Sequence, residues 1–256
     1  MEFFVRPDSI VRQIWGKGDT ILFIFAGASA EFALNKAVDW LYFTGKLPAD
    51  PLGRLFSTVS YARQIVFSSH EEAIAAIDRI TAIHTAVEKG RAQQIPDWAY
   101  RDVLFMLIDY SMRAFEVLER KLSPEEEAET FDVFYRVGLQ MNLTVLPTTL
   151  ADWKIMRDEH LNTNLAFSHF TQDLYSQYKK HLGIARYHVL LQTQVLVVPQ
   201  RVNRLLALDR VKWLMPVLQV YKLSRLINMD QMIRNMILPD KYVNEVKNLD
   251  NFSRLS

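Results

Sequence analysis

His84 is the side chain of this sequence whose type and position most clearly suggest chemistry. It lies in RITAIHTAV (79–87), and on a helix it would share one face with Ile77, Ile80 and Val87. We expect that face to point into the protein interior. A buried imidazole needs partners for two ring nitrogens, because leaving one unpaired costs about 1–3 kcal/mol. His84 is therefore expected to be either hydrogen-bonded in the core or bound to a ligand there.

The sequence lacks the residues and spacings of several common catalytic sites. It contains no cysteine, which excludes disulfides, cysteine-ligated zinc, iron–sulfur clusters and thiol nucleophiles. The Glu-x-x-His motifs of di-iron bundles are absent, and GASAE (27–31) lacks the last glycine of a hydrolase elbow. A single imidazole on an apolar helix face is compatible with axial ligation of haem, and a core histidine is the alternative. The later histidines are interpreted as surface or hydrogen-bonded side chains: His160, His169, His181 and His188.

Caps and helix breakers locate the elements that must position His84. Ser69 with Glu72 and Ser123 with Glu126 form two capping-box patterns, and Asp19 is a further candidate N-cap. Two segments, LTVLP (143–147) and LLQTQVLVVP (190–199), have strand-like composition, although the second is equally compatible with a buried helix. The sequence predicts an all-α fold, a single globular domain of roughly ten helices over residues 1–256. The clearest helices are expected over 20–43, 51–67, 70–90, 97–121 and 150–161, and a further helix is expected to start at Pro124 in a unit that Pro147 closes.

Two stretches, DPLGRLFSTVSYARQIVF (50–67) and HTAVEKG (84–90), resemble a family of oxygenases. The family includes bacterial latex-clearing rubber oxygenases and the fungal prenyl-cleaving oxygenase of mycophenolic acid synthesis. It typically shows the pattern D-P-x-x-R-x-x-x-T-x-x-Y, then a histidine followed by valine and glycine. The resemblance is best over residues 20–160. The matching positions are Asp50, Pro51, Arg54, Thr58, Tyr61, His84, Val87 and Gly90.

This resemblance implies a cofactor, a reaction class and three site residues. It implies an all-α oxidoreductase that uses haem b and O₂ on a hydrophobic substrate, olefinic or prenyl-type, with His84 as the ligand of the haem iron. Arg54 and Thr58 would lie at the haem pocket, and their spacing of four places them on one helix face. No catalytic base is assigned. Asp109 and Glu116 are candidates only through their place on the helix expected over 97–121.

Departures from the family pattern keep two other hypotheses open. Ser57 stands where rubber oxygenases can have lysine. FMLID (105–109) replaces a frequent Trp-Val-His, and FALNKAVDW (32–40) lacks the His-Pro that many members carry. The second hypothesis is therefore a non-enzymatic carrier or sensor of haem or another hydrophobic ligand. The third is a helical interaction protein in which His84 is a structural residue and tolerates replacement by leucine.

Composition and charge limit the partners that we expect. A net charge of +1 argues against a dedicated nucleic-acid binder. The C-terminal third is locally basic, with eleven Lys/Arg against five Asp/Glu from Arg186 to Arg254. This excess favours peripheral contact with anionic lipid or another partner, and a solvated face is the alternative. The lack of a signal-like start, of a transmembrane stretch and of cysteine leads us to expect a cytoplasmic protein.

Overall fold

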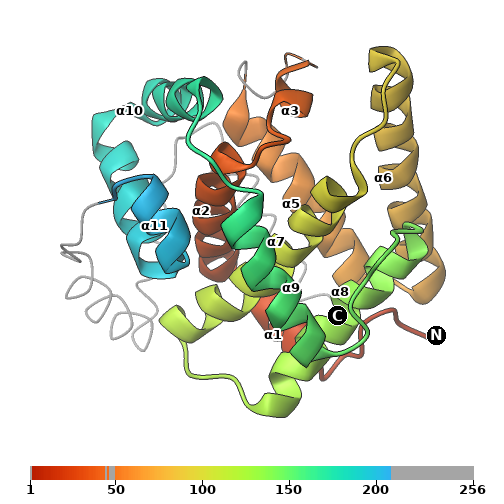
Figure 1. Cartoon of the computed structure of the whole chain (residues 1–256). Coiled ribbons are helices and arrows are strands. Elements are labelled where there is room, and N and C mark those ends of the chain that lie inside the picture. Colours follow the sequence, from red (N-terminus) through yellow and green to blue (C-terminus); the bar gives the residue numbers. More distant parts are fainter. Residues whose placement is uncertain (1, 44, 46–49, 209–256) are drawn as a thin grey trace.

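The computed structural model describes residues 2–43, 45 and 50–208, and gives only the backbone of residues 41 and 51–57. Their regular secondary structure is helical throughout, which confirms the all-α class, and the number of helices is close to the roughly ten expected (Figure 1). The helices are α1 (Ile10–Trp15), α2 (Gly18–Leu34), α3 (Asp39–Phe43), α5 (Pro51–Phe67), α6 (His70–Arg91), α7 (Asp97–Leu118), α8 (Pro124–Gln140), α9 (Leu150–Thr163), α10 (His169–Val197) and α11 (Gln200–Leu205).

Helix α2 lies at the centre of the described fold. It packs against α7 and α10 and also contacts α1 and α11 (Figure 1). Most of its side chains are buried on several faces, as expected for a helix that is apolar nearly all round. Gly27 allows the closest approach, because a Cβ there would lie 2.2 Å from a ring carbon of Tyr110 on α7. Gly27 therefore belongs to a tight helix crossing, in agreement with its exclusion as part of a hydrolase elbow.

The predicted helix starts are confirmed where the sequence carries strong caps. Both capping boxes form, with Ser69 and Glu72 at the start of α6 and Ser123 and Glu126 at the start of α8. The Thr149 hydroxyl accepts a hydrogen bond from the backbone N–H of Asp152 and caps α9. Each of these caps satisfies N–H groups that have no partner within the helix.

Two expectations about helix and strand extents are wrong. The helix predicted over 20–43 is interrupted at Asn35, whose side chain accepts a hydrogen bond from the N–H of Ala37 and donates one to Asp102. Asp19 lies in the first turn of α2 and is not its N-cap, which is Lys17. The strand-like composition of 143–147 does not produce a strand, since the segment is irregular. For 190–199 the helical alternative is confirmed, because residues 190–197 form the last turns of α10.

Helix α10 bends at Gly183. Its backbone angles there are φ 72° and ψ 168°, which are accessible essentially to glycine alone. The two arms fold toward each other, because the Tyr175 hydroxyl donates a hydrogen bond to the side-chain oxygen of Gln194. Among the residues described, no helix combines the length and apolar character needed to cross a membrane.

Candidate functional site

The α5–α6 hairpin carries the three residues that the sequence singles out. Arg54 and Thr58 lie on α5 and His84 on α6, and these packed helices are joined by only two residues (Figure 1). Arg54 lies 13 positions before the end of α5, and His84 lies 14 positions after the start of α6. At 1.5 Å per residue, each is about 20 Å from the connection. The hairpin therefore places Arg54 and His84 at the same level, with Thr58 one turn closer to the connection.

The side-chain environment of His84 differs from the expected interior position. The imidazole is half-buried, although Ile77 on the same face is fully buried. The first two turns of α6 supply its buried residues, whereas Ile83 and Thr85, which flank His84 in the sequence, are exposed. The reason is that the core covers the beginning of α6 and leaves much of its second half to solvent. Thr58 is likewise half-buried, and the side chain of Arg54 lies outside the described residues.

Tyr100, near the start of α7, packs against the His84 ring. The two ring centroids are 5.2 Å apart in an edge-on arrangement. The Tyr100 hydroxyl donates a 3.0 Å hydrogen bond to Glu88, one turn further along α6, and the N–H of Ile95 donates to the same carboxylate oxygen. Burial, together with the hydrogen bond to Glu88, raises the pKa of Tyr100, so the phenol stays neutral. These contacts fix the start of α7 beside His84.

The C-terminal end of α6 is also fixed to α3. Arg91 forms a 2.7 Å ion pair with Asp39, and its guanidinium lies 4.1 Å from the centroid of the Trp40 ring. Stacking on tryptophan is a favourable position for a guanidinium. As a result, the segment around His84 is held by α7 and α3 although much of its surface is open.

A second polar region, which we call the buried charge network, lies among α2, α7 and α9. Arg157 donates two parallel hydrogen bonds to Glu31, of 2.5 and 2.6 Å, and two more to Asp109, of 2.9 and 3.1 Å. The Tyr110 hydroxyl donates a 2.8 Å hydrogen bond to Glu31. All four side chains are almost completely buried. A bidentate arginine–carboxylate pair is among the strongest polar contacts in proteins.

His160 extends the buried charge network toward α3. One ring nitrogen donates to Glu31 at 3.1 Å, and the other donates to Asp102. Asp102 also accepts hydrogen bonds from the side-chain amides of Asn35 and Asn164. The interpretation of His160 as a hydrogen-bonded histidine is confirmed, and its surface alternative is wrong, because only 4 % of the residue is exposed.

The electrostatics of the buried charge network favour the charged forms of Glu31 and His160. Burial alone would raise the pKa of Glu31, but the charge and hydrogen bonds of Arg157 and His160 lower it to about 2. Burial would lower the pKa of His160, yet its hydrogen bonds to Asp102 and Glu31 raise it above the usual value. A protonated His160 also balances the charge. The three carboxylates of Glu31, Asp102 and Asp109 are then matched by three cations, Arg113, Arg157 and His160.

The two carboxylates named as candidate bases have structural partners. Asp109 belongs to the buried charge network, and Glu116 accepts hydrogen bonds from Lys121 and from the N–H of Leu122 at the end of α7. Five aromatic and methionine side chains of α7 are buried in the main hydrophobic core. These are Phe105, Met106, Tyr110, Met112 and Phe115.

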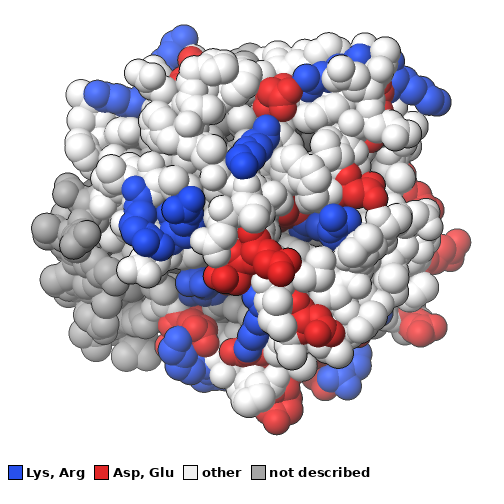
Figure 2. All heavy atoms as spheres, viewed as in Figure 1, with Lys and Arg blue, Asp and Glu red and all other residues white. Residues whose placement is uncertain are grey.

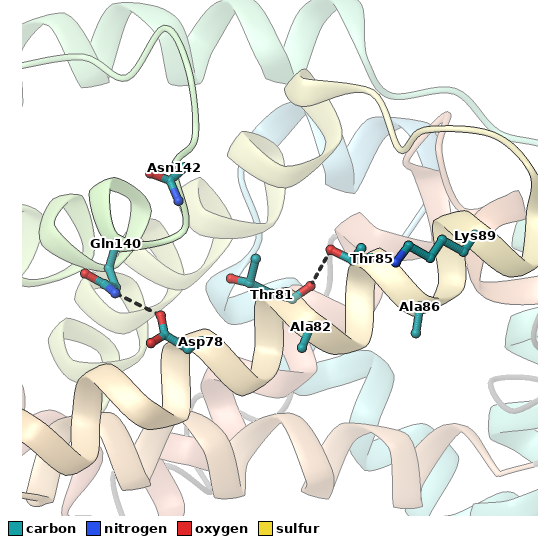
Figure 3. A pocket seen from close by; sticks show the side chains of 8 residues that line it. All are labelled: Asp78, Thr81, Ala82, Thr85, Ala86, Lys89, Gln140 and Asn142. Carbon is teal, nitrogen blue, oxygen red and sulfur yellow. Dashed lines mark hydrogen bonds between the residues drawn. The ribbon is translucent and has the colours of Figure 1, made fainter.

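A hollow of about 430 Å³ lies beside α6, and His84 is not among its lining residues (Figure 3). Residues of α6 from Asp78 to Lys89 form its floor, and Gln140 and Asn142 lie opposite. Gln140 donates a 2.8 Å hydrogen bond to Asp78 across one end. In helix steps of 100° per residue, Lys89 and His84 point about 140° apart, so the hollow does not include the candidate ligand.

Comparison with known proteins identifies the class to which this fold belongs. A family model described as "ER-bound oxygenase mpaB/B'/Rubber oxygenase, catalytic domain" matches residues 14–226. Since the match covers most of the chain, the protein belongs to this family. No curated protein and no solved structure matches it. The resemblance found in residues 50–67 and 84–90 is therefore confirmed at the level of the family.

Proposed function

We propose that this protein is a haem-b-dependent oxygenase that acts with O₂ on a small hydrophobic substrate, olefinic or prenyl-type. The observation that carries the proposal is the α5–α6 hairpin, which brings Arg54 and Thr58 near the level of His84. Membership of an oxygenase family supports the reaction class. A single domain over residues 1–256 and a cytoplasmic location remain predictions.

The residues around His84 fit an axial haem ligand. In the described part of the chain, no three His, Asp or Glu side chains gather closely enough to hold a metal ion. An iron bound by His84 would thus need its other ligands from a macrocycle. The half-buried ring, with apolar Ile80 and Val87 on the same face, also suits a group that is largely apolar. We therefore assign His84 as the iron ligand.

Each of the other residues has a distinct part in this proposal. Tyr100 packs against the edge of the His84 ring and limits its rotation. Arg54, always charged, would pair with a haem propionate, and the Thr58 hydroxyl would offer a hydrogen bond at the pocket. When bound, haem supplies the iron that binds and activates O₂. The protein's task is then to orient this group and keep bulk water from the substrate.

The visible absorption spectrum tests the haem assignment. Protein from haem-supplemented cells should show a Soret band that His84→Ala loses or shifts strongly, and His188→Ala, at an exposed histidine of α10, should leave it unchanged. No Soret band in the wild type, even after hemin is added, would refute the assignment. His84 would then be a structural residue of an interaction protein.

Oxygen uptake separates the oxygenase from a carrier or sensor. The carrier hypothesis rests on FMLID (105–109) and FALNKAVDW (32–40), which stand where the family often carries Trp-Val-His and His-Pro. We expect haem-loaded wild-type protein to consume O₂ in the presence of unsaturated isoprenoid chains. Haem binding without O₂ consumption over a panel of such substrates would favour the carrier.

A further inference from the structure

The bend of α10 forms a basic corner, defined here as the α10 corner (residues 179–186). Lys179 and Lys180 end the first arm and are exposed, and Arg186 begins the second arm and is half-exposed. None of the three forms an ion pair with an acidic side chain of the described residues. These charges are therefore available to an outside anion.

No acidic residue offsets this charge along the neighbouring chain. From Leu174 to Leu208 the sequence has five Lys/Arg and no Asp or Glu. Figure 2 shows blue side chains where Figure 1 has α10 and α11, while most red side chains lie elsewhere on this face. Because surface charges act over roughly 10 Å at ordinary ionic strength, the corner presents a local positive potential although the whole chain is near neutral.

An exposed apolar side chain lies among these cations. Ile184 is 68 % exposed, the second largest exposure among the large hydrophobic residues described. Its neighbours Gly183 and Ala185 are small and exposed, so no bulky side chain next to it in the sequence shields it. The Gly183 backbone, with φ 72°, sets this turn at the outermost point between the two arms.

We infer that the α10 corner docks on the surface of an anionic lipid bilayer. Lysines near such a surface each add a modest, salt-sensitive attraction to negative headgroups, and an apolar side chain between them can enter the interface. Within the described part of the chain, the exposed lysines have no carboxylate partner that would fix a direction, which suits a diffuse charged surface better than one bound anion. Residues 179–186 include no Phe, Tyr or Trp, so the corner lacks the aromatic platform expected for nucleic acid.

This inference is compatible with a hydrophobic substrate drawn from a membrane. That connection alone depends on the proposed oxygenase function, since an olefinic or prenyl chain would partition into lipid. The docking itself does not require haem or activity. A failed Soret assay and a failed vesicle assay would therefore be separate results.

Vesicle co-sedimentation of the full chain tests the docking. Wild-type protein should bind vesicles of phosphatidylcholine with phosphatidylserine and not vesicles of phosphatidylcholine alone, and high salt should weaken the binding. Lys179→Gln/Lys180→Gln should lower the partition coefficient roughly 25-fold, which is about 1 kcal/mol for each charge. Ile184→Ser should lower it roughly fivefold because the apolar contact is lost.

Matched variants on other helices control for net charge and hydrophobicity. Arg79→Gln/Lys89→Gln removes two exposed charges from α6, and Ile155→Ser removes an isoleucine of α9 that is 62 % exposed. Both should bind vesicles as the wild type does. Equal losses in the control and corner variants, or no preference of the wild type for phosphatidylserine, would overturn the inference. Thermal melts by circular dichroism confirm that each variant is folded before binding is compared.

Discussion

The buried charge network and the surroundings of His84 show two opposite uses of histidine in one fold. His160 is almost fully buried, and both of its ring nitrogens are hydrogen-bonded to carboxylates. His84 is half-buried, and the contact described for its ring is the edge of Tyr100. A histidine whose two nitrogens are committed to the protein cannot ligate a metal. His160 is therefore a structural residue, whereas ligand binding by His84 remains a proposal.

The largest expected effect comes from removing the cation at the centre of the buried charge network. Arg157→Met should lower the free energy of unfolding by about 3–5 kcal/mol, because Glu31 and Asp109 would be left buried without their main partner. Urea unfolding followed by circular dichroism measures the loss.

Lys154, on the same helix, is the matched control. It forms a 2.6 Å ion pair with Glu127, but its side chain is 55 % exposed. Lys154→Met should change the free energy of unfolding by at most about 1 kcal/mol, as is usual for surface pairs. If both variants lost the same free energy of unfolding, the buried charge network would contribute no more to stability than an ordinary surface ion pair.

Sequence patterns predicted the local part of this structure and missed the network. Capping boxes such as Ser69 with Glu72 depend on residues three positions apart and could be identified directly. Glu31, by contrast, was seen only as an interruption of an apolar stretch. Its partner Arg157 lies 126 positions away, so no local pattern joins them. The available signal was a charge in the middle of an apolar helix, which demands a buried partner.

For the site, the sequence identified candidate residues through family resemblance and misjudged their burial. The apolar residues at steps of three and four predicted an interior His84, but periodicity does not tell how far neighbouring helices extend along a face. The same limit explains why the sequence did not predict that the helix ends at Asn35. Its bonds to the distant Asp102 and the nearby Ala37 N–H end α2, where the local sequence favoured a longer helix.

Gly27 tests whether the helix crossing and the buried charge network form one unit. Gly27→Ala should cost about 1–3 kcal/mol of stability, because its Cβ would lie 2.2 Å from the Tyr110 ring, whose hydroxyl is bonded to Glu31. Thermal unfolding measures the effect. Gly138→Ala is the milder control, since its Cβ would meet terminal methyl groups of Leu104 and Leu146. A larger loss at Gly138 would contradict the tight-crossing argument.

The pH dependence of stability should distinguish His160 from His84. The folded-state pKa of His160 is raised above 6.5, so its contribution is complete below pH 6.5 and is lost as pH rises through the folded value. Glu31 has its pKa lowered from 4.5 to about 2, so its contribution is complete above pH 4.5 and is lost as pH falls toward 2. The stabilising effect of this pair should thus be greatest between about pH 4.5 and 6.5.

Urea titrations across this pH range measure the free energy of unfolding of the wild type, His160→Gln and His84→Gln. His160→Gln should flatten the alkaline decline, whereas His84→Gln should keep it, because His84 has no place in the buried charge network. The groups that face His160 are Asp102 on α7 and Glu31 on α2, and both stay in place in the two variants. An unchanged decline in His160→Gln would assign the alkaline titration to another group.

The smallest expected effect is that of His84 on the stability of the haem-free protein. His84→Leu should change the free energy of unfolding by less than about 1 kcal/mol, since the ring is half-buried and leucine keeps an apolar contact with the edge of Tyr100. Chemical denaturation of the haem-free form gives this value, and absorbance after hemin addition then reports ligation. Because the stability is nearly unchanged, loss of the Soret band in the same variant would come from the missing ligand and not from unfolding. A loss of several kcal/mol would instead show that the His84 ring stabilises the fold as the His160 ring does, and the division between the two histidines would fail.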